Sequence, residues 1–479
     1  MVARQKALRP LPIRPALSPY QGRAVTVMGL GLFGGGVGAA RYLARQGARV
    51  TVTDLKPAAS LKPSLSALKG LPITFHLGRH AAADFTRADL VVVSPAVDKR
   101  KSKFVRMARK AGVGITSEMN LFAAACPVPI VGITGSNGKS TTTALVADML
   151  RAHRPTRLGG NIGKSLLDDL AEIGPRETVV LELSSFQLED LAAVGKSPHV
   201  AIVTNISPNH LDRHGTMRAY IEAKQNILRF QRAGDVAVLN ADDPEVGTWK
   251  TKRGVRTVFF SAERRLARGV YADGTAIVFR LGRRTERVDL AGRNPLLGRH
   301  NVSNILAAAA AARVLGVPAK KIGCAISKFH ALPHRLEPVG RRDGVLFIND
   351  SKATTPLAAK AAIEAFAEPV VLIAGGYDKH SSVQPMVGPI RRRARAVVLI
   401  GATAPKLAKA IGRGGPRVER AKTLRQAVRC AVALARPGDV VLLSTGHASW
   451  DMFDNYEQRG ERFRQAALAL GMKPYGKAR

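Results

Sequence analysis

The chain has 479 residues, too many for one hydrophobic core, and this length predicts about three domains. Hydrophobic residues make up 46% of the chain, which indicates a globular protein, and no apolar run reaches the roughly eighteen residues of a membrane span. Its 74 Lys and Arg against 35 Asp and Glu give a formal net charge of +39, compatible with nucleic acid, an anionic membrane or polyanionic substrates.

The basic residues are scattered through every region, and only "RRRARA" at 391–396 is concentrated. Aromatic residues are 5% of the chain, so no stacking platform for bases is indicated. We therefore favour a solvated basic surface over a nucleic-acid site, while binding to anionic lipid headgroups stays open. Cys126, Cys324 and Cys430 are widely spaced and odd in number, which argues against a disulfide framework or a zinc site and fits a reducing, cytoplasmic location.

The first segment, residues 1–117 with a lead-in at 1–22, contains the strand-like runs "AVTVMGLG", "ARVTVTD" and "ADLVVVSPAV". Gly29, Gly31 and Gly34 form G-x-G-x-x-G after the first run, and Asp54 ends the second. This pattern is typical of a dinucleotide-binding fold, so an NAD-dependent dehydrogenase is a rival hypothesis. The basic start and the apolar glycine-rich run imitate a signal peptide, but the glycine spacing favours strand, turn and helix.

The second segment, residues 118–332, carries the turn "GITGSNGKSTTT" between an apolar strand and a helical run. Gly135 and Gly138 permit a close approach that larger residues forbid, so backbone N–H groups and a helix N-terminus converge on an anion. Lys139 adds a charge for phosphate oxygens, and the Ser140 hydroxyl suits magnesium. The first glycine misses the G-x-x-x-x-G-K-[ST] spacing by one residue. The order of strand, loop, lysine, hydroxyl and helix still predicts a nucleoside triphosphate site.

Two side chains after neighbouring strands extend this site. Glu182 lies in "ETVVLELSS", and His210 follows "HVAIVTNIS". Because open α/β sheets bind ligands at the carboxyl ends of their strands, we expect both side chains beside Lys139 and Ser140. The segment continues with "DVAVLNADD", "GTAIVFRLG" and the alanine-rich helix "NVSNILAAAAAARVLG".

The third segment, residues 333–479, contains the strand-like runs "VLFINDS", "PVVLIAGG", "RAVVLIG" and "DVVLLSTG". Strands and helices alternate in all three segments, which predicts parallel sheets covered by helices. The expected fold class is therefore α/β in three domains, each built on a largely parallel sheet: Rossmann-like, then P-loop ATPase-like, then Rossmann-like again.

Nine motifs in register resemble the Mur ligase family, from about residue 24 to about residue 465. They are "GITGSNGKST", "GGNIG", "ELSSFQLE", "NHLDRH", "AYIEAK", "HNVSNILAA", "PHRLE", "NDSKAT" and "NYEQRG". The resemblance implies a cytoplasmic, ATP-dependent acid–amino-acid ligase of peptidoglycan synthesis that uses Mg²⁺. "SSFQLE" and "FDNYEQRG" favour the member that adds D-glutamate to UDP-N-acetylmuramoyl-L-alanine through an acyl phosphate. Its first domain would bind UDP rather than NAD, and we expect a monomer without a nucleic-acid partner.

Site residues are carried over by motif. The resemblance implies four catalytic residues: Lys139, Glu182, His210 and Lys224. Lys224 matches the family's carbamylated lysine. The implied magnesium ligands are Ser140, Glu182, His210 and Lys224. The nucleotide would be bound by Gly135, Ser136, Asn137, Gly138, Lys139, Ser140, Thr141, Asn301, Asn304, Arg335 and Asp350. The UDP substrate and the amino acid would be bound by Gly31, Asp54, Lys56, Ser94, Asn161, Ser184, His334, Lys352, Thr354, Lys379, Ser449 and Tyr456.

Some positions depart from the family pattern. Phe33, Leu55 and Ala96 alter the expected uridine contacts, and "STGHASWD" at 444–451 replaces the usual loop beside the amino acid. An enzyme of the same fold that uses L-glutamate or another amino acid therefore remains an alternative. The dehydrogenase and a basic nucleic-acid-binding module that holds ATP are alternatives from other classes.

Overall fold

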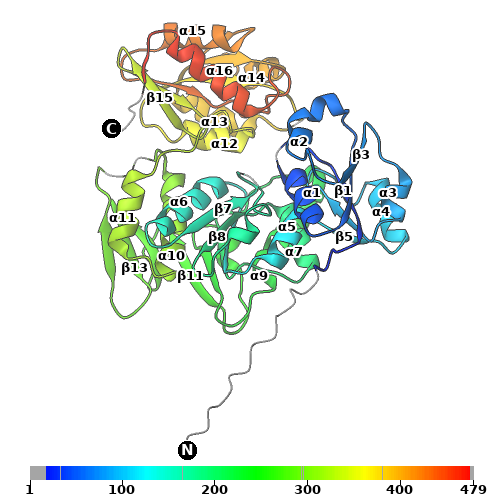
Figure 1. Ribbon diagram of the computed structural model, residues 1–479. Coiled ribbons are helices and arrows are strands. Elements are labelled where there is room, and N and C mark those ends of the chain that lie inside the picture. Colours follow the sequence, from blue (N-terminus) through cyan, green and yellow to red (C-terminus); the bar gives the residue numbers. More distant parts are fainter. Residues whose placement is uncertain are drawn as a thin grey trace, which may run out of the picture.

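The computed structural model describes residues 18–474, except residues 33, 164, 293, 295 and 380. Residues 1–17 of the lead-in predicted at 1–22, together with Phe33, thus lie outside the described residues. Three sheets follow one another along the chain, each flanked by helices, and in Figure 1 the C-terminal domain lies above the central one. The predicted α/β class with three largely parallel sheets is confirmed, whereas the boundaries at 117 and 332 stay predictions. Within the described ranges, no helix is both long and apolar enough to cross a lipid bilayer.

The N-terminal domain is a five-stranded parallel sheet in the order β3-β2-β1-β4-β5. Its strands are β1 (Ala24–Met28), β2 (Arg49–Asp54), β3 (Ile73–Leu77), β4 (Leu90–Val93) and β5 (Gly114–Thr116). Its helices are α1 (Gly35–Arg45), α2 (Lys62–Ser66), α3 (Ala82–Thr86) and α4 (Lys103–Lys110), followed by α5 (Glu118–Ala125). The glycine turn predicted before α1 is present, because Gly34 adopts a φ of 88° at the N-cap.

The central domain is a nine-stranded sheet in the order β14-β13-β12-β11-β10-β9-β6-β8-β7, with antiparallel pairing only at β12-β13 and β13-β14 among the described strands. Its strands are β6 (Ile130–Thr134), β7 (Thr156–Gly160), β8 (Thr178–Glu182), β9 (Val200–Val203), β10 (Val236–Asn240), β11 (Arg256–Ser261), β12 (Gly269–Asp273), β13 (Ala276–Arg280) and β14 (Glu286–Asp289). Its helices are α6 (Lys139–Arg151), α7 (Ser185–Ala193), α8 (Leu211–His214), α9 (Met217–Arg229), α10 (Arg299–Val314) and α11 (Ala319–Lys328). The predicted alanine-rich helix is α10, whose small buried side chains let it pack closely against α6.

The C-terminal domain is a seven-stranded sheet in the order β19-β18-β17-β20-β16-β15-β21, antiparallel only where β15 pairs with β16 and β21 within the described chain. Its strands are β15 (Glu337–Arg342), β16 (Val345–Asn349), β17 (Val370–Gly375), β18 (Ala394–Ile400), β19 (Arg417–Arg420), β20 (Val440–Leu443) and β21 (Lys473–Pro474). Its helices are α12 (Pro356–Ile363), α13 (Gln384–Arg393), α14 (Ala404–Ile411), α15 (Leu424–Leu434) and α16 (Tyr456–Leu468).

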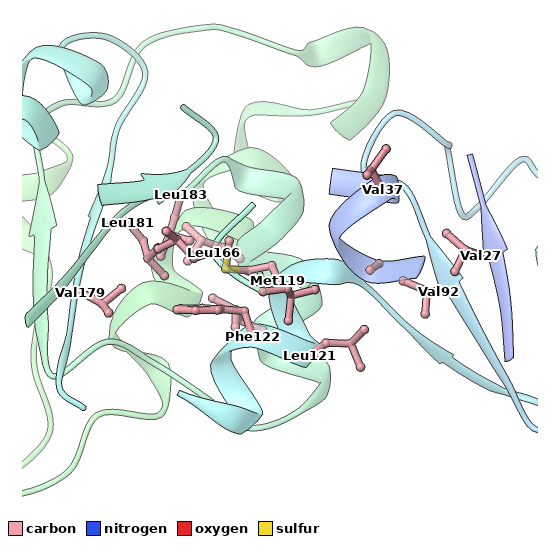
Figure 2. Packing of buried hydrophobic residues seen from close by; sticks show 14 of the residues in the cluster. Val27, Val37, Val92, Met119, Leu121, Phe122, Leu166, Val179, Leu181 and Leu183 are labelled. Carbon is pink, nitrogen blue, oxygen red and sulfur yellow. The ribbon is translucent and has the colours of Figure 1, made fainter. Parts of the chain in front are cut away.

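One apolar core continues from the N-terminal domain into the central domain. Figure 2 shows Val27 and Val92 of the first sheet on one side of α5 and Leu181 and Leu183 of the second on the other. Leu121 of α5 belongs to the same buried cluster, so this helix joins the two domains. Two other clusters, on the two faces of the third sheet, form the core of the C-terminal domain.

Ion pairs reinforce the junction of the first two domains. The loop after β4 carries Asp98, Lys99 and Arg100, and these side chains pair with residues of α7 and α8. Lys99 pairs with Asp190, and Arg213 Nε lies 3.7 Å from a carboxylate oxygen of Asp98. The shared core and these pairs hold the first two domains in one relative position.

Candidate active site

The phosphate loop is the turn from β6 to α6. Gly135 has a φ of 148° and Gly138 one of 81°, and a Cβ at either position would lie about 2 Å from Thr204 Oγ1 or Asn304 Oδ1. Only glycine therefore fits at these two positions. The Lys139 ammonium donates to the carbonyl oxygens of Gly135 and Ser136, each at 3.0 Å, so it lies across the mouth of the loop.

Glu182, the last residue of β8, lies beside this loop. Asn161 Nδ2 donates to Glu182 Oε1 at 3.0 Å, whereas Glu182 Oε2 is buried without a hydrogen-bond partner. Burial raises the pKa of Glu182, but Lys139, Ser140, Asn161 and Arg335 together outweigh it and leave the pKa lowered. The carboxylate is therefore charged, and one of its oxygens is available to a cation.

Arg335 brings the C-terminal domain to the loop. Its Nη2 donates to the Ser140 hydroxyl at 2.8 Å, and its Nε is buried without a partner. A guanidinium with an unsatisfied donor beside a phosphate loop is suited to an anionic oxygen.

Lys224 and His210 lie on the other side of the loop. The Lys224 side chain is 2% exposed and donates to Thr134 Oγ1 and the Gly135 carbonyl oxygen. Burial lowers the pKa of Lys224 well below 10.5, and the charge of Lys139 lowers it further. Desolvation, Lys139 and Lys224 lower the pKa of His210 to about 4, so its imidazole is neutral. His210 has a φ of 53° at the start of α8, and its ring meets that of Phe186 edge to face.

These side chains fit a magnesium ion in part. Ser140 and Glu182 offer the hard oxygen ligands that Mg²⁺ prefers, including the unpartnered Glu182 Oε2. Across the part of the chain that the structure describes, no three His, Cys, Asp or Glu side chains cluster as a metal site. An unmodified Lys224 is a donor rather than a ligand, so its part in metal binding depends on carbamylation, which would turn it into an oxygen ligand.

Asn301 and Asn304 at the start of α10 are buried, and Asn304 is hydrogen-bonded to α6, the helix that follows the phosphate loop. Thr142 Oγ1 donates to Asn304 Oδ1, Asn304 Nδ2 donates to Asn301 Oδ1, and Asn301 Nδ2 donates to the Leu297 carbonyl oxygen. This chain of hydrogen bonds fixes the beginning of α10 against α6. Among the predicted loop residues, Thr141 is also buried in α6.

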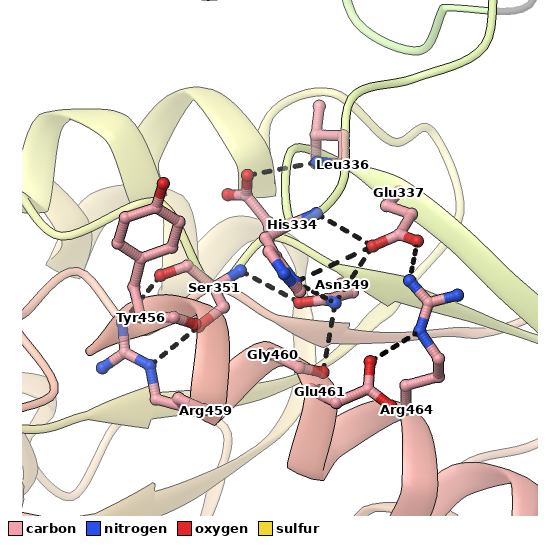
Figure 3. A network of polar contacts seen from close by, with 11 residues as sticks. His334, Leu336, Glu337, Asn349, Ser351, Tyr456, Arg459, Gly460, Glu461 and Arg464 are labelled. Carbon is pink, nitrogen blue, oxygen red and sulfur yellow. Dashed lines mark hydrogen bonds and ion pairs between the residues drawn. The ribbon is translucent and has the colours of Figure 1, made fainter. Parts of the chain in front are cut away.

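Four predicted residues of the C-terminal domain lie in the network of Figure 3 or next to it. His334 Nδ1 lies 2.9 Å from Asn349 Nδ2, and the two oxygens of Asp350 accept from Leu336 N–H and the Ser444 hydroxyl. The Lys352 ammonium lies 5.0 Å from the centroid of the Tyr456 ring.

The charge of Glu182 in the central domain affects the pKa values of two groups in the C-terminal domain. Desolvation and Arg335 lower the pKa of Lys352 to about 8, while Glu182 raises it. Burial raises the pKa of Tyr456, and Glu182 contributes to this rise. The "NDSKAT" and "NYEQRG" motifs therefore lie near Glu182 across the boundary between the domains.

Of the four residues predicted for the amino acid, Thr354, Lys379 and Ser449 lie in separate loops of the C-terminal domain, whereas Tyr456 begins α16. Thr354 follows Lys352, and the Thr354 N–H donates to the Lys352 carbonyl oxygen. Ser449 is buried in the loop after β20, and the Lys379 ammonium lies 4.4 Å from the centroid of the Trp450 ring.

The predicted uridine residues form a group of their own. Asp54 Oδ2 accepts from the N–H groups of Leu30 and Gly31, and Asp54 Oδ1 accepts from Lys56 N–H. The carboxylate thus holds the glycine turn, a use that competes with the ribose contact of an NAD enzyme. The side chain of Ser94 faces Gly29, because a Cβ added to Gly29 would lie 2.9 Å from the Ser94 Cβ.

Ser184, predicted to contact substrate, caps α7 in a capping box with Gln187.

Sequence reasoning missed several residues that shape the loop. Asn137 N–H donates to Asn205 Oδ1, and the Ser136 hydroxyl lies 2.9 Å from the Tyr220 hydroxyl. Asn205 ends the run "AIVTN", so a polar residue directly after a buried strand could have identified it. Arg459, Trp450 and Phe186 had no local signal of this kind.

Three α/β domains with a phosphate loop, a buried carboxylate and an arginine at their meeting point define a nucleotide-dependent enzyme. Family models match most of the described chain: "Mur ligase MurD-like, N-terminal domain" over residues 23–117, "Mur ligase middle domain" over 133–312 and "Mur ligase, glutamate ligase domain" over 334–446. The chain belongs to the Mur ligase family.

Relatives of similar length support this assignment. The chain is 46% identical to the UDP-N-acetylmuramoylalanine–D-glutamate ligase of Roseiflexus sp. strain RS-1, over 93% of this chain and 98% of that protein. It is 43% identical to the ligase of the same name from Geobacter metallireducens, over 94% and 98%.

Solved structures share the three-domain fold. UDP-N-acetylmuramate–alanine ligase MurC from Thermotoga maritima has a TM-score of 0.60 at 20% identity, covering 94% of this chain and all of that one. MurF from Thermotoga maritima in complex with ADP has a TM-score of 0.56 at 18% identity, covering 94% and 96%.

Proposed function

We propose that this protein is an ATP-dependent ligase that joins D-glutamate to UDP-N-acetylmuramoyl-L-alanine in peptidoglycan synthesis. The observation that carries the proposal is the hydrogen bond from Arg335 to Ser140 beside Glu182, because it completes a triphosphate site from two domains. The choice of substrates is supported by relatives named UDP-N-acetylmuramoylalanine–D-glutamate ligase, at 39–46% identity over at least 90% of the chain.

In the proposed reaction the γ-phosphoryl group of ATP is transferred to the alanine carboxylate. The amino group of glutamate then attacks this acyl phosphate, an amide bond forms, and phosphate leaves. Lys139, the loop N–H groups and the unsatisfied Arg335 Nε would bind the phosphates and stabilise charge on the transferred group. Mg²⁺, held by Ser140 and Glu182, would neutralise charge on the same group.

The other substrates would bind on either side of the triphosphate. The uridine end would lie against the glycine turn that Asp54 holds, with Asn161 nearer the acceptor carboxylate. Glutamate would bind to Lys379, Ser449 and Thr354 in the C-terminal domain. Contact between the domains would exclude water, which otherwise hydrolyses an acyl phosphate.

The decisive experiment measures phosphate release from ATP with UDP-N-acetylmuramoyl-L-alanine and a panel of D- and L-amino acids. We expect release that depends strictly on D-glutamate, and Lys139→Ala should abolish it. Release with L-glutamate alone would instead favour the same fold with another amino acid. No release with any amino acid would refute the proposal. The cytoplasmic location and the monomeric state stay predictions.

A further inference from the structure

Lys379 and Trp450 meet at the tips of two loops in the C-terminal domain. The Lys379 ammonium lies 4.4 Å from the centroid of the Trp450 ring, and the Tyr377 ring lies 5.6 Å from that same ring. The Trp450 side chain is 61% exposed, so it is not part of the domain core. An exposed tryptophan that neither fills the core nor donates a hydrogen bond within the described residues requires another explanation.

The two loops are held in a fixed relation. Tyr377 and Ala448 form an antiparallel bridge, in which Tyr377 N–H donates to the Ala448 carbonyl oxygen at 2.9 Å. On the far side of Trp450, Asp451 Oδ2 accepts from Ala402 N–H at 2.8 Å. The backbone that carries the indole is therefore anchored before and after it.

Lys379 faces the central domain without a carboxylate partner among the described residues. Desolvation lowers the pKa of Lys379, and the charge of Asp212 in α8 raises it, which places the ammonium towards that helix. No ion pair of Lys379 exists in the described ranges, whereas Lys406 on the same side pairs with Asp378.

The kind of contact matters for binding an acid. A carboxylate partner would neutralise a lysine, but the face of an indole ring attracts the ammonium through its quadrupole and leaves the charge available. Holding the flexible lysine stem also reduces the conformational entropy that substrate binding must overcome. An aromatic ring at this position thus keeps a cation in place for a carboxylate that arrives later.

We propose that Trp450 is a positioning residue for the amino-acid substrate, whose indole face holds the Lys379 ammonium where it binds a carboxylate of glutamate. This inference rests on the proposed function. It gives a role to the "SW" of "STGHASWD", the loop that departs from the family pattern.

The first test is kinetic. Trp450→Leu should raise the KM for D-glutamate about three- to tenfold, the size of one partly exposed cation–π contact, with kcat and the KM values for ATP and the UDP substrate nearly unchanged. Trp450→Phe, which keeps an aromatic face, should restore most of the loss. Lys406→Met removes a neighbouring lysine that does not contact the ring and is the matched control, expected to leave the KM for glutamate unchanged.

A double-mutant cycle shows whether Trp450 acts through Lys379. In a Lys379→Gln background, Trp450→Leu should change the KM for glutamate by less than about twofold, because the partner is already lost. Additive effects of the two substitutions would overturn the positioning role.

The second test is spectroscopic and needs no turnover. The chain has two tryptophans, and Trp249 is buried in the central domain, so the difference in fluorescence between the wild type and Trp450→Phe reports Trp450. Adding D-glutamate to the complex with the UDP substrate and a non-hydrolysable ATP analogue should change this signal, and Lys379→Gln should abolish the change. A wild type without ligase activity would refute the proposed function. Normal wild-type activity with an unchanged KM in Trp450→Leu and no signal change would refute only the role of Trp450.

Discussion

Arg335 of the C-terminal domain donates from Nη2 to the hydroxyl of Ser140 in the central domain, at 2.8 Å, while Arg335 Nε stays buried and unpartnered. Ser140 also helps to lower the pKa of Glu182, whose Oε2 is likewise buried without a partner. One unsatisfied donor and one unsatisfied acceptor thus lie on either side of a single serine. An anionic phosphate and a cation would satisfy both at once, which explains why neither group is paired within the protein.

Arg335→Lys should therefore lower kcat by about 10²-fold, because a lysine lacks the planar fork that reaches two acceptors. The KM for the UDP substrate should stay nearly constant, since the hydrogen bond from Arg335 to the central domain goes to Ser140, directly after the phosphate loop. Steady-state kinetics with each substrate varied in turn measures both values. Arg392→Lys, at an exposed arginine paired with Glu364, is the control. An equal loss in both variants would contradict the role of Arg335.

Glu182→Gln should raise the Mg²⁺ concentration for half-maximal ATP turnover at least about tenfold. The glutamine amide keeps the side-chain volume and an oxygen that accepts from Asn161, but it loses the negative charge that would bind Mg²⁺. A magnesium titration of phosphate release gives the value. Glu189→Gln, on the neighbouring helix α7, should leave the titration unchanged, and the assignment fails if both variants shift alike.

Lys224 should react with carbon dioxide. Burial and Lys139 lower the pKa of Lys224 well below 10.5, so a larger share of the amine is unprotonated than in an exposed lysine and can form a carbamate with loss of a proton. We expect activity to fall when carbon dioxide is removed at mildly acidic pH and to return with bicarbonate. Lys224→Arg should be inactive under both conditions. Full activity in thoroughly degassed buffer would contradict a carbamate.

Asp350→Asn should stabilise the protein in a pH-dependent way. Burial raises the pKa of Asp350 from 3.8 to about 7, so the native state keeps a proton that the unfolded chain loses as pH rises between these values. Asp350 thus destabilises the native state increasingly up to about pH 7, by an amount of up to about 4 kcal/mol. The melting temperature of Asp350→Asn relative to the wild type should therefore be higher at pH 8 than at pH 5. The same difference at both pH values would show that Asp350 is not protonated in the native state.

Arg459→Met should destabilise the C-terminal domain. The Arg459 side chain is 1% exposed and donates to the Ser351 hydroxyl and carbonyl oxygens and to the His447 carbonyl oxygen. Methionine removes all three donors from these buried acceptors, of which the His447 carbonyl oxygen keeps a hydrogen bond from the Thr445 hydroxyl, at a cost of roughly 2–5 kcal/mol. Urea denaturation followed by circular dichroism measures the loss. Arg462→Met, an exposed arginine on the same helix, should cost less than about 0.5 kcal/mol. Similar losses in the two variants would show that burial of Arg459 is not the cause.

The strands that the sequence predicts are those with their own apolar runs. β8 and β10 are buried throughout, so the apolar runs in "TVVLE" and "VAVLN" identify them as strands from the sequence alone. Edge strands such as β14 and β19 read "ERVD" and "RVER", because one side of an edge strand faces water, and their pairing depends on a neighbour elsewhere in the chain. Local sequence therefore cannot identify them.

The candidate site divides in the same way. Glu182 ends a buried strand, and Lys139 and Ser140 begin the helix after the turn that follows another buried strand, so position alone suggests their use. Arg459 has the sequence context of an exposed helix charge, and only the fold shows that Ser351 and the loop at 444–451 close around it. Trp450 becomes meaningful only when the loop bearing Lys379 is placed beside it.

The core that passes through α5 has a consequence for the order of events in the proposed reaction. Because the first two domains share one interior, the span from the uridine end to the acceptor carboxylate is set before any substrate arrives. The C-terminal domain has interiors of its own, so the span from the glutamate amine to that carboxylate varies with its position. The sugar nucleotide can therefore enter first at full affinity, whereas the amine reaches its target only when the third domain has docked.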